Sequence, residues 1–228
     1  SSITWRNVTS ELLDEKIVEP VWKKKILVLS TYSSFPPRGG GQHRSFNLYS
    51  GMAKDFDITI CSIIESNKEH KNLILANGLK QICIPQSGKH AENQWNLERK
   101  SGANLYDIGM IDFVTQSDEY VRNVKTLITE SDIVIFSHPY LFGLDKYVTP
   151  SHVTIYEAVD SEYFLKQGYI KDEAILSKVF SIEKQACTQS DLIWSTSEED
   201  RQNLIRLYGV SPDKVVIIPN GVDPSLIR

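Results

Sequence analysis

A run of three glycines is the segment of this sequence that is best suited to binding chemistry. Gly39, Gly40 and Gly41 follow a short apolar segment, residues 25–30, and precede a helical pattern at residues 42–54. Glycine lets the backbone approach a ligand closely, and the N-terminus of a helix attracts anions. The pattern therefore predicts a phosphate site at this run of glycines. The alternative is a flexible turn that is rich in glycine and binds nothing.

Two arginines flank this run, and each can pair with a phosphate or with an acidic second substrate. For Arg38 and Arg44 alike, an ordinary solvated charge is the competing interpretation. Gly39 and Gly41 match the first two positions of the dinucleotide pattern G-x-G-x-x-G, but Arg44 occupies the third. The glycines also lie about ten residues beyond the strand, whereas the dinucleotide turn follows its strand directly. Glu65 could mimic the acid that binds ribose, yet the pattern disfavours a nicotinamide oxidoreductase.

Polar side chains that follow two further apolar segments form a second group of candidates. His138 and Tyr140 come after residues 132–137, and Asp160 and Glu162 come after residues 153–158. An imidazole can hydrogen-bond a sugar hydroxyl or orient a reacting group, and carboxylates can bind sugar hydroxyls or a cation. The competing interpretations are a structural histidine and acids that stabilise a helix N-terminus. No spacing of histidine, cysteine and acidic residues indicates a zinc site, so we expect neither a metal nor a bound cofactor.

These candidates sit in a regular alternation of strand-like and helical segments. Short apolar runs separated by amphipathic helices predict a doubly wound, mostly parallel α/β sheet of Rossmann-like type, which binds ligands at the carboxyl ends of its strands. We expect an extension at residues 1–24, with a short helix capped by Ser10, followed by one domain at 25–218. Residues 71–77 read as a helix closed by Gly78, and residues 85–115 as a long loop with at most a short helix. The seven expected strands are 25–30, 57–64, 80–84, 132–137, 153–158, 192–195 and 214–218.

Composition narrows the class of partner. The formal net charge is −4, which disfavours nucleic acid. The chain has only three cysteines, Cys61, Cys83 and Cys187. A small, odd number of cysteines argues against a disulfide framework, so we expect reduced thiols. No apolar run approaches the roughly 20 residues that span a bilayer. We therefore expect a cytoplasmic protein, with peripheral contact at the inner face of a membrane left open.

The ordered set of segments resembles the N-terminal half of the family-four retaining glycosyltransferases of GT-B fold. The resemblance rests on residues 25–30, on Pro36-Pro37-Arg38-Gly39-Gly40-Gly41-Gln42-His43-Arg44, on residues 133–138 and 191–198, and on Val216-Ile217-Ile218-Pro219-Asn220-Gly221-Val222-Asp223. It implies that Gly40 and Gly41 approach the donor diphosphate and that His138 lies near the reacting sugar. It also implies that Asn220 and Gly221, within residues 219–228, begin the hinge to a C-terminal donor domain that is absent from this chain.

The activity that the resemblance implies is transfer of a sugar from a nucleotide sugar to an acceptor hydroxyl, with anomeric retention. The acceptor would be a glycan, a lipid or a small molecule, and it would lie beside Arg38, Arg44, Tyr140, Asp160 and Glu162. Without a donor domain we expect the isolated chain to be inactive. The alternatives are a non-catalytic module that binds sugar or nucleotide, and a nucleotide-sugar epimerase of the same fold.

Overall fold

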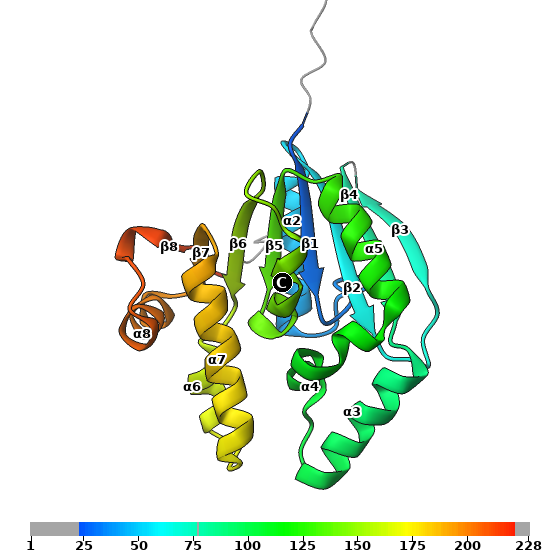
Figure 1. Cartoon of the computed structure of the whole chain (residues 1–228). Coiled ribbons are helices and arrows are strands. Elements are labelled where there is room, and N and C mark those ends of the chain that lie inside the picture. The colour runs from blue at the N-terminus through cyan, green and yellow to red at the C-terminus, as the bar shows by residue number, and fades with distance from the viewer. Residues whose placement is uncertain (1–22, 77, 222–228) are drawn as a thin grey trace, which may run out of the picture.

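The computed structural model describes residues 23–76 and 78–221. The helix expected after Ser10 and the final residues of the expected hinge lie outside this part of the chain. The described residues form an eight-stranded sheet with the order β3-β4-β2-β1-β5-β6-β7-β8, and Figure 1 shows helices on both of its faces. Every neighbouring pair is parallel except β3 and β4. The strands are β1 (Lys25–Ser30), β2 (Asp57–Ile64), β3 (Lys71–Ala76), β4 (Leu79–Pro85), β5 (Ile133–Ser137), β6 (Val153–Ala158), β7 (Leu192–Ser195) and β8 (Val215–Ile217).

All seven expected strands are confirmed, and β1 shows why they could be recognised. Its side chains alternate between two hydrophobic clusters, with Ile26 and Val28 in one and Leu27 and Leu29 in the other. A strand that is buried on both faces carries a continuous apolar run rather than an alternating one.

The helices are α2 (Gly40–Met52), α3 (Gly88–Ser101), α4 (Tyr106–Phe113), α5 (Asp118–Thr129), α6 (Glu162–Gln167), α7 (Glu173–Gln189) and α8 (Glu198–Tyr208).

The helix expected at residues 71–77 is wrong. This segment forms β3, an edge strand that pairs antiparallel with β4. Leu73 and Leu75 are half-buried, whereas Ile74 between them is 82% exposed, so the pattern has the period of a strand. Gly78 does adopt the positive φ expected of it, at 81°, but it serves the turn into β4. A side chain there would also lie 2.7 Å from the Ala53 carbonyl oxygen.

The long loop expected at residues 85–115 is also wrong, because the segment holds α3 and α4. Ser87 caps α3 by accepting a hydrogen bond from the backbone N–H of His90, and Gly102 ends it in the left-handed conformation. Only His90 and Gln94 are buried on α3, so the helix has no apolar stripe to reveal it. Gly109 on α4 permits close packing, since a side chain there would overlap Gln94.

Candidate functional site

Two glutamines hold the loop between β1 and α2 in a fixed shape. The fully buried Gln81 on β4 accepts hydrogen bonds from the N–H groups of Ser34 and Phe35, at 2.8 and 3.1 Å. Gln42 on α2 accepts from the N–H groups of Arg38 and Gly39 and donates to the loop carbonyl of Ser33, at 2.8, 3.0 and 2.9 Å. The loop is therefore positioned by side chains of the sheet and of the helix that it joins.

The glycine run forms the beginning of α2 itself rather than a loop before the helix. Gly39 is the residue before the first turn, and Gly40 and Gly41 are the first two helical residues. The first N–H groups of a helix have no partner within the helix, and they carry its partial positive charge. A side chain at Gly40 would meet nothing within 4 Å, whereas one at Gly41 would lie 3.1 Å from the Tyr32 hydroxyl. The geometry suits an anion at this end of α2.

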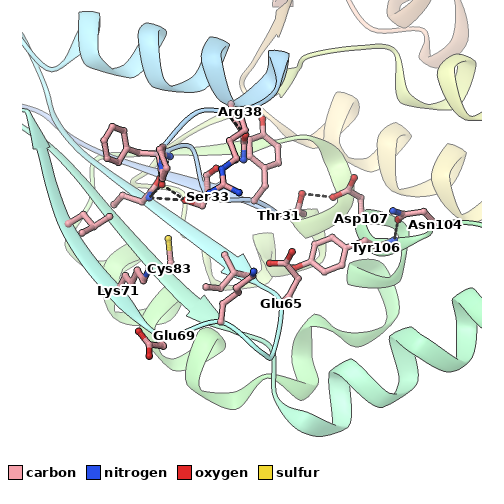
Figure 2. A pocket seen from close by; sticks show the side chains of 18 of the residues that line it. Thr31, Ser33, Arg38, Glu65, Glu69, Lys71, Cys83, Asn104, Tyr106 and Asp107 are labelled. Carbon is pink, nitrogen blue, oxygen red and sulfur yellow. Dashed lines mark hydrogen bonds between the residues drawn. The ribbon is translucent and has the colours of Figure 1, made fainter.

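A cavity of about 820 Å³ opens beside this loop at the carboxyl ends of β1 and β2 (Figure 2). Its lining includes Tyr32, Arg38 and Gln42 from the loop and α2, together with polar side chains from the β2–β3 connection, α3 and α4. Acids and bases both contribute, so the cavity has no single dominant charge. The charged members are Arg38, Glu65, Lys68, Glu69, Lys71, Glu98 and Asp107.

Tyr106, at the start of α4, supplies the cavity with a hydrogen-bond donor. Its hydroxyl is buried and has no protein partner within the described part of the chain. Burial, reinforced by the nearby carboxylates of Glu65 and Asp107, raises the pKa of the Tyr106 phenol far above its usual range, so the group stays protonated. Asp107 accepts a hydrogen bond from the Thr31 hydroxyl at 2.6 Å. Tyr106 and Asp107 were not expected from the sequence because α4 was not expected.

His138 occupies a strained position at the end of β5. Its φ of 66° and ψ of 161° lie in a region that is otherwise largely restricted to glycine. Two tyrosine rings lie near the imidazole, with the Tyr32 centroid 5.7 Å and the Tyr140 centroid 6.4 Å away. Its Nδ1 is buried without a protein partner among the described residues. Because Tyr32 also lines the cavity, it joins the cavity to His138.

Glu162 meets His138 from the first residue of α6. The Glu162 Oε1 atom lies 3.6 Å from His138 Nε2. Its other oxygen accepts a short hydrogen bond from the Tyr140 hydroxyl and lies 3.5 Å from the Lys166 ammonium. Glu162 and Tyr140 are 2% and 1% exposed, so both are enclosed rather than open to a ligand. Asp160 is exposed, and partial desolvation followed by the charge of Glu162 raises its pKa.

The remaining expected site residues are placed apart from the cavity. Arg44 does not line it, because its guanidinium is buried and donates to Glu157 Oε1 at 3.2 Å and to Asn220 Oδ1 at 3.0 Å. Tyr49 completes this cluster by donating to Glu157 Oε2 at 2.7 Å. Asn220 is therefore tied to the domain, and the adjoining Gly221 is exposed. Of the two arginines, only Arg38 reaches the cavity.

Three further features of the described residues concern the cysteines, metal binding and membrane spanning. All three cysteines are free and buried. No cluster of three histidine, cysteine or acidic side chains is arranged to hold a metal within residues 23–76 and 78–221. In the same residues, every helix is too short or too polar to cross a bilayer.

Comparison with solved structures defines the class of fold. The chain superposes on a sucrose-phosphate synthase from Thermosynechococcus elongatus with a TM-score of 0.60 and 11% identity, over 88% of this chain and 49% of that one. It superposes on an α,α-trehalose-phosphate synthase (UDP-forming) from Burkholderia vietnamiensis with a TM-score of 0.51 and 10% identity, over 88% of this chain and 49% of that one. It superposes on Anabaena Alr3699/HepE in complex with UDP with a TM-score of 0.51 and 12% identity, over 87% of this chain and 44% of that one. The fold is the Rossmann-like N-terminal half of GT-B glycosyltransferases, and the chain spans about half the length of these structures.

The family follows from the sequence model that matches this chain. Residues 106–226, more than half of the chain, match the model of Glycosyltransferase Family 4. The chain belongs to this family, as its ordered motifs suggested. No curated protein sequence matches it significantly.

Proposed function

We propose that this chain is the acceptor-side domain of a hexosyltransferase that moves a sugar from a nucleotide sugar to an acceptor hydroxyl with retention. The observation that carries the proposal is the cavity that adjoins His138 through the shared side chain of Tyr32. Family membership supports sugar transfer, and the UDP bound to Anabaena HepE supports a nucleotide-sugar donor.

The acceptor would lie in the cavity with its reacting hydroxyl toward His138. Tyr106 offers a donor, and Glu65 and Asp107 offer acceptors, which together match the alternating donors and acceptors of a hydroxyl-rich molecule. This chemistry favours a sugar or a glycan over a purely apolar acceptor. A lipid acceptor would fit through a sugar headgroup, and the protein would then work in the cytoplasm at the inner face of a membrane.

The donor would approach from the side of α2 and His138. The N–H groups of Gly40 and Gly41 would stabilise the charge that develops on the leaving diphosphate. The unpartnered Nδ1 of His138 would hydrogen-bond the transferred sugar. These groups need no metal or bound cofactor. Most of the nucleotide would be held by the family's C-terminal domain, so this chain alone would bind donor weakly and would be inactive.

The test joins this chain to a C-terminal donor domain and measures release of free nucleotide from a panel of nucleotide sugars, with and without hydroxyl-rich acceptors. Replacing His138 with alanine should lower transfer by about a hundredfold or more. His70, which pairs with Glu119 at the surface, provides a matched control whose replacement should leave transfer unchanged.

Three results would contradict the proposal or a part of it. Binding of a sugar in the cavity without transfer by any donor would favour a non-catalytic module. Interconversion of nucleotide sugars in the absence of acceptor would favour an epimerase. Binding of a nucleotide sugar by the isolated chain more tightly than about 1 µM would refute the weak-donor part.

A further inference from the structure

Glu183 on α7 is a fully buried carboxylate, and two of its hydrogen bonds come from the start of α6. Its Oε1 accepts from the backbone N–H of Glu162 at 2.8 Å, and its Oε2 accepts from the N–H of Tyr163 at 2.8 Å. Two phenols complete the set, Tyr156 at 3.0 Å and Tyr208 at 2.6 Å. Four donors match the lone pairs of one carboxylate, so Glu183 is fully satisfied although it has no cationic partner among these contacts.

The two N–H groups that Glu183 accepts are the first of helix α6. The side chain of the residue before a helix normally accepts a hydrogen bond from the second or third helical N–H. Here that residue is Ser161, whose hydroxyl makes no capping bond and is buried without a partner in the described part of the chain. Glu183 therefore caps α6 from another helix, and it fixes where the first residue of α6 lies.

We propose that Glu183 is a positioning residue that holds the start of α6 so that Glu162 presents its carboxylate to His138. Glu162 takes part in both contacts. Its backbone N–H donates to Glu183, and its Oε1 atom lies 3.6 Å from the imidazole of His138. The inference rests on the proposed function only where it concerns activity. Its structural part concerns contacts within this chain.

Replacing Glu183 with glutamine tests this role selectively. Glutamine keeps one carbonyl oxygen, but its NH₂ group cannot accept, so one of the two α6 N–H groups loses its acceptor. The phenols of Tyr156 and Tyr208 can rotate to accept instead, because a hydroxyl is both donor and acceptor. The substitution therefore weakens the cap more than it weakens the packing of the tyrosines.

The matched control is Tyr208→Phe, which removes a donor to Glu183 and leaves both α6 N–H bonds in place. In the isotopically labelled chain, Glu183→Gln should speed amide exchange by tenfold or more at whichever of Glu162 and Tyr163 loses its acceptor. It should also move the ring ¹⁵N resonances of His138 in the direction that Glu162→Gln moves them. Tyr208→Phe should destabilise the domain but leave these resonances and both amides unchanged.

The double variant Glu162→Gln/Glu183→Gln tests whether Glu183 acts on His138 through Glu162. If it does, the His138 resonances of the double variant should match those of Glu162→Gln alone. Unchanged His138 resonances in Glu183→Gln, or equal changes in Tyr208→Phe, would overturn the positioning role whatever the activity. In the chain joined to a donor domain, Glu183→Gln should lower kcat at least tenfold with little change in KM for acceptor. Resonances that respond while kcat stays constant would uphold the contact and refute the catalytic use of His138.

Discussion

Replacing Arg44 with methionine tests how strongly the buried pair with Glu157 supports the domain. The side chains are 4% and 0% exposed, and Arg44 Nε lies 3.2 Å from Glu157 Oε1. At this separation two unit charges attract by about 5 kcal/mol at an effective dielectric constant of about 20. Removing one partner of such a pair leaves the other charge uncompensated, which costs about 3 to 5 kcal/mol.

Urea unfolding of the chain, followed by circular dichroism, measures this cost. A loss of about 3 to 5 kcal/mol is a large share of the roughly 5 to 15 kcal/mol that stabilises a typical domain. The control is Lys24→Met at the exposed pair with Asp132, where the loss should stay below about 1 kcal/mol. A loss below about 1 kcal/mol for Arg44→Met as well would refute the reasoning.

Three further outcomes follow from single groups. Gly78→Ala should destabilise the domain by more than about 1 kcal/mol, because φ is 81° and the new Cβ would lie 2.7 Å from the Ala53 carbonyl oxygen; unfolding midpoints check this. Asp191 accepts a hydrogen bond from the Thr154 N–H, which lowers the pKa of the Asp191 carboxyl. The stability that this bond contributes is present above the unfolded pKa of about 3.9, and it is lost as the pH falls through the folded pKa. Asp191→Asn should therefore lessen the loss of stability between about pH 5 and pH 2, as measured by urea midpoints. Tyr106→Phe should raise KM for the acceptor without destabilising the domain, since the buried hydroxyl has no partner to lose among the described residues; kinetics beside thermal unfolding decide it.

Much of the fold could be predicted because the strands carry their own signal. Parallel strands that are buried on both faces carry nearly continuous apolar runs, as in residues 26–29 of β1 and 133–136 of β5. The errors occur where local sequence and tertiary environment disagree. β3 is a strand because β4 offers it an edge, and α3 is a helix through its caps rather than through an apolar face.

The candidate site, too, could be predicted only in part. His138 and Glu162 could be predicted to lie close together, because the carboxyl ends of neighbouring parallel strands meet at one edge of the sheet. The contribution of Tyr106 could not be predicted, because it depends on the unexpected α4. The burial of Arg44 could not be predicted either, since its partner Glu157 is an acid inside an apolar strand, 113 residues away.

Glu157 connects His138, which is proposed to bind the transferred sugar, with Asn220, where the hinge to a donor domain is expected to begin. Its backbone carbonyl accepts from the His138 N–H at 3.1 Å, while its carboxylate holds the guanidinium that binds Asn220. In Arg44→Met/Glu157→Gln, glutamine can still accept from Tyr49 and no charge is left buried, so most of the lost stability should return.

The contact between Arg44 and Asn220 is not restored in that double variant, so stability should recover whereas activity should not. With the chain joined to a donor domain, the variant should unfold near the wild-type urea midpoint and yet transfer sugar more slowly than the wild type. Asn220→Ala in the wild-type background should lower the rate by a similar factor, since it removes the same contact from the other side. Recovery of the wild-type rate together with stability would show that Arg44 serves only the fold and that the tie to Asn220 has no part in transfer.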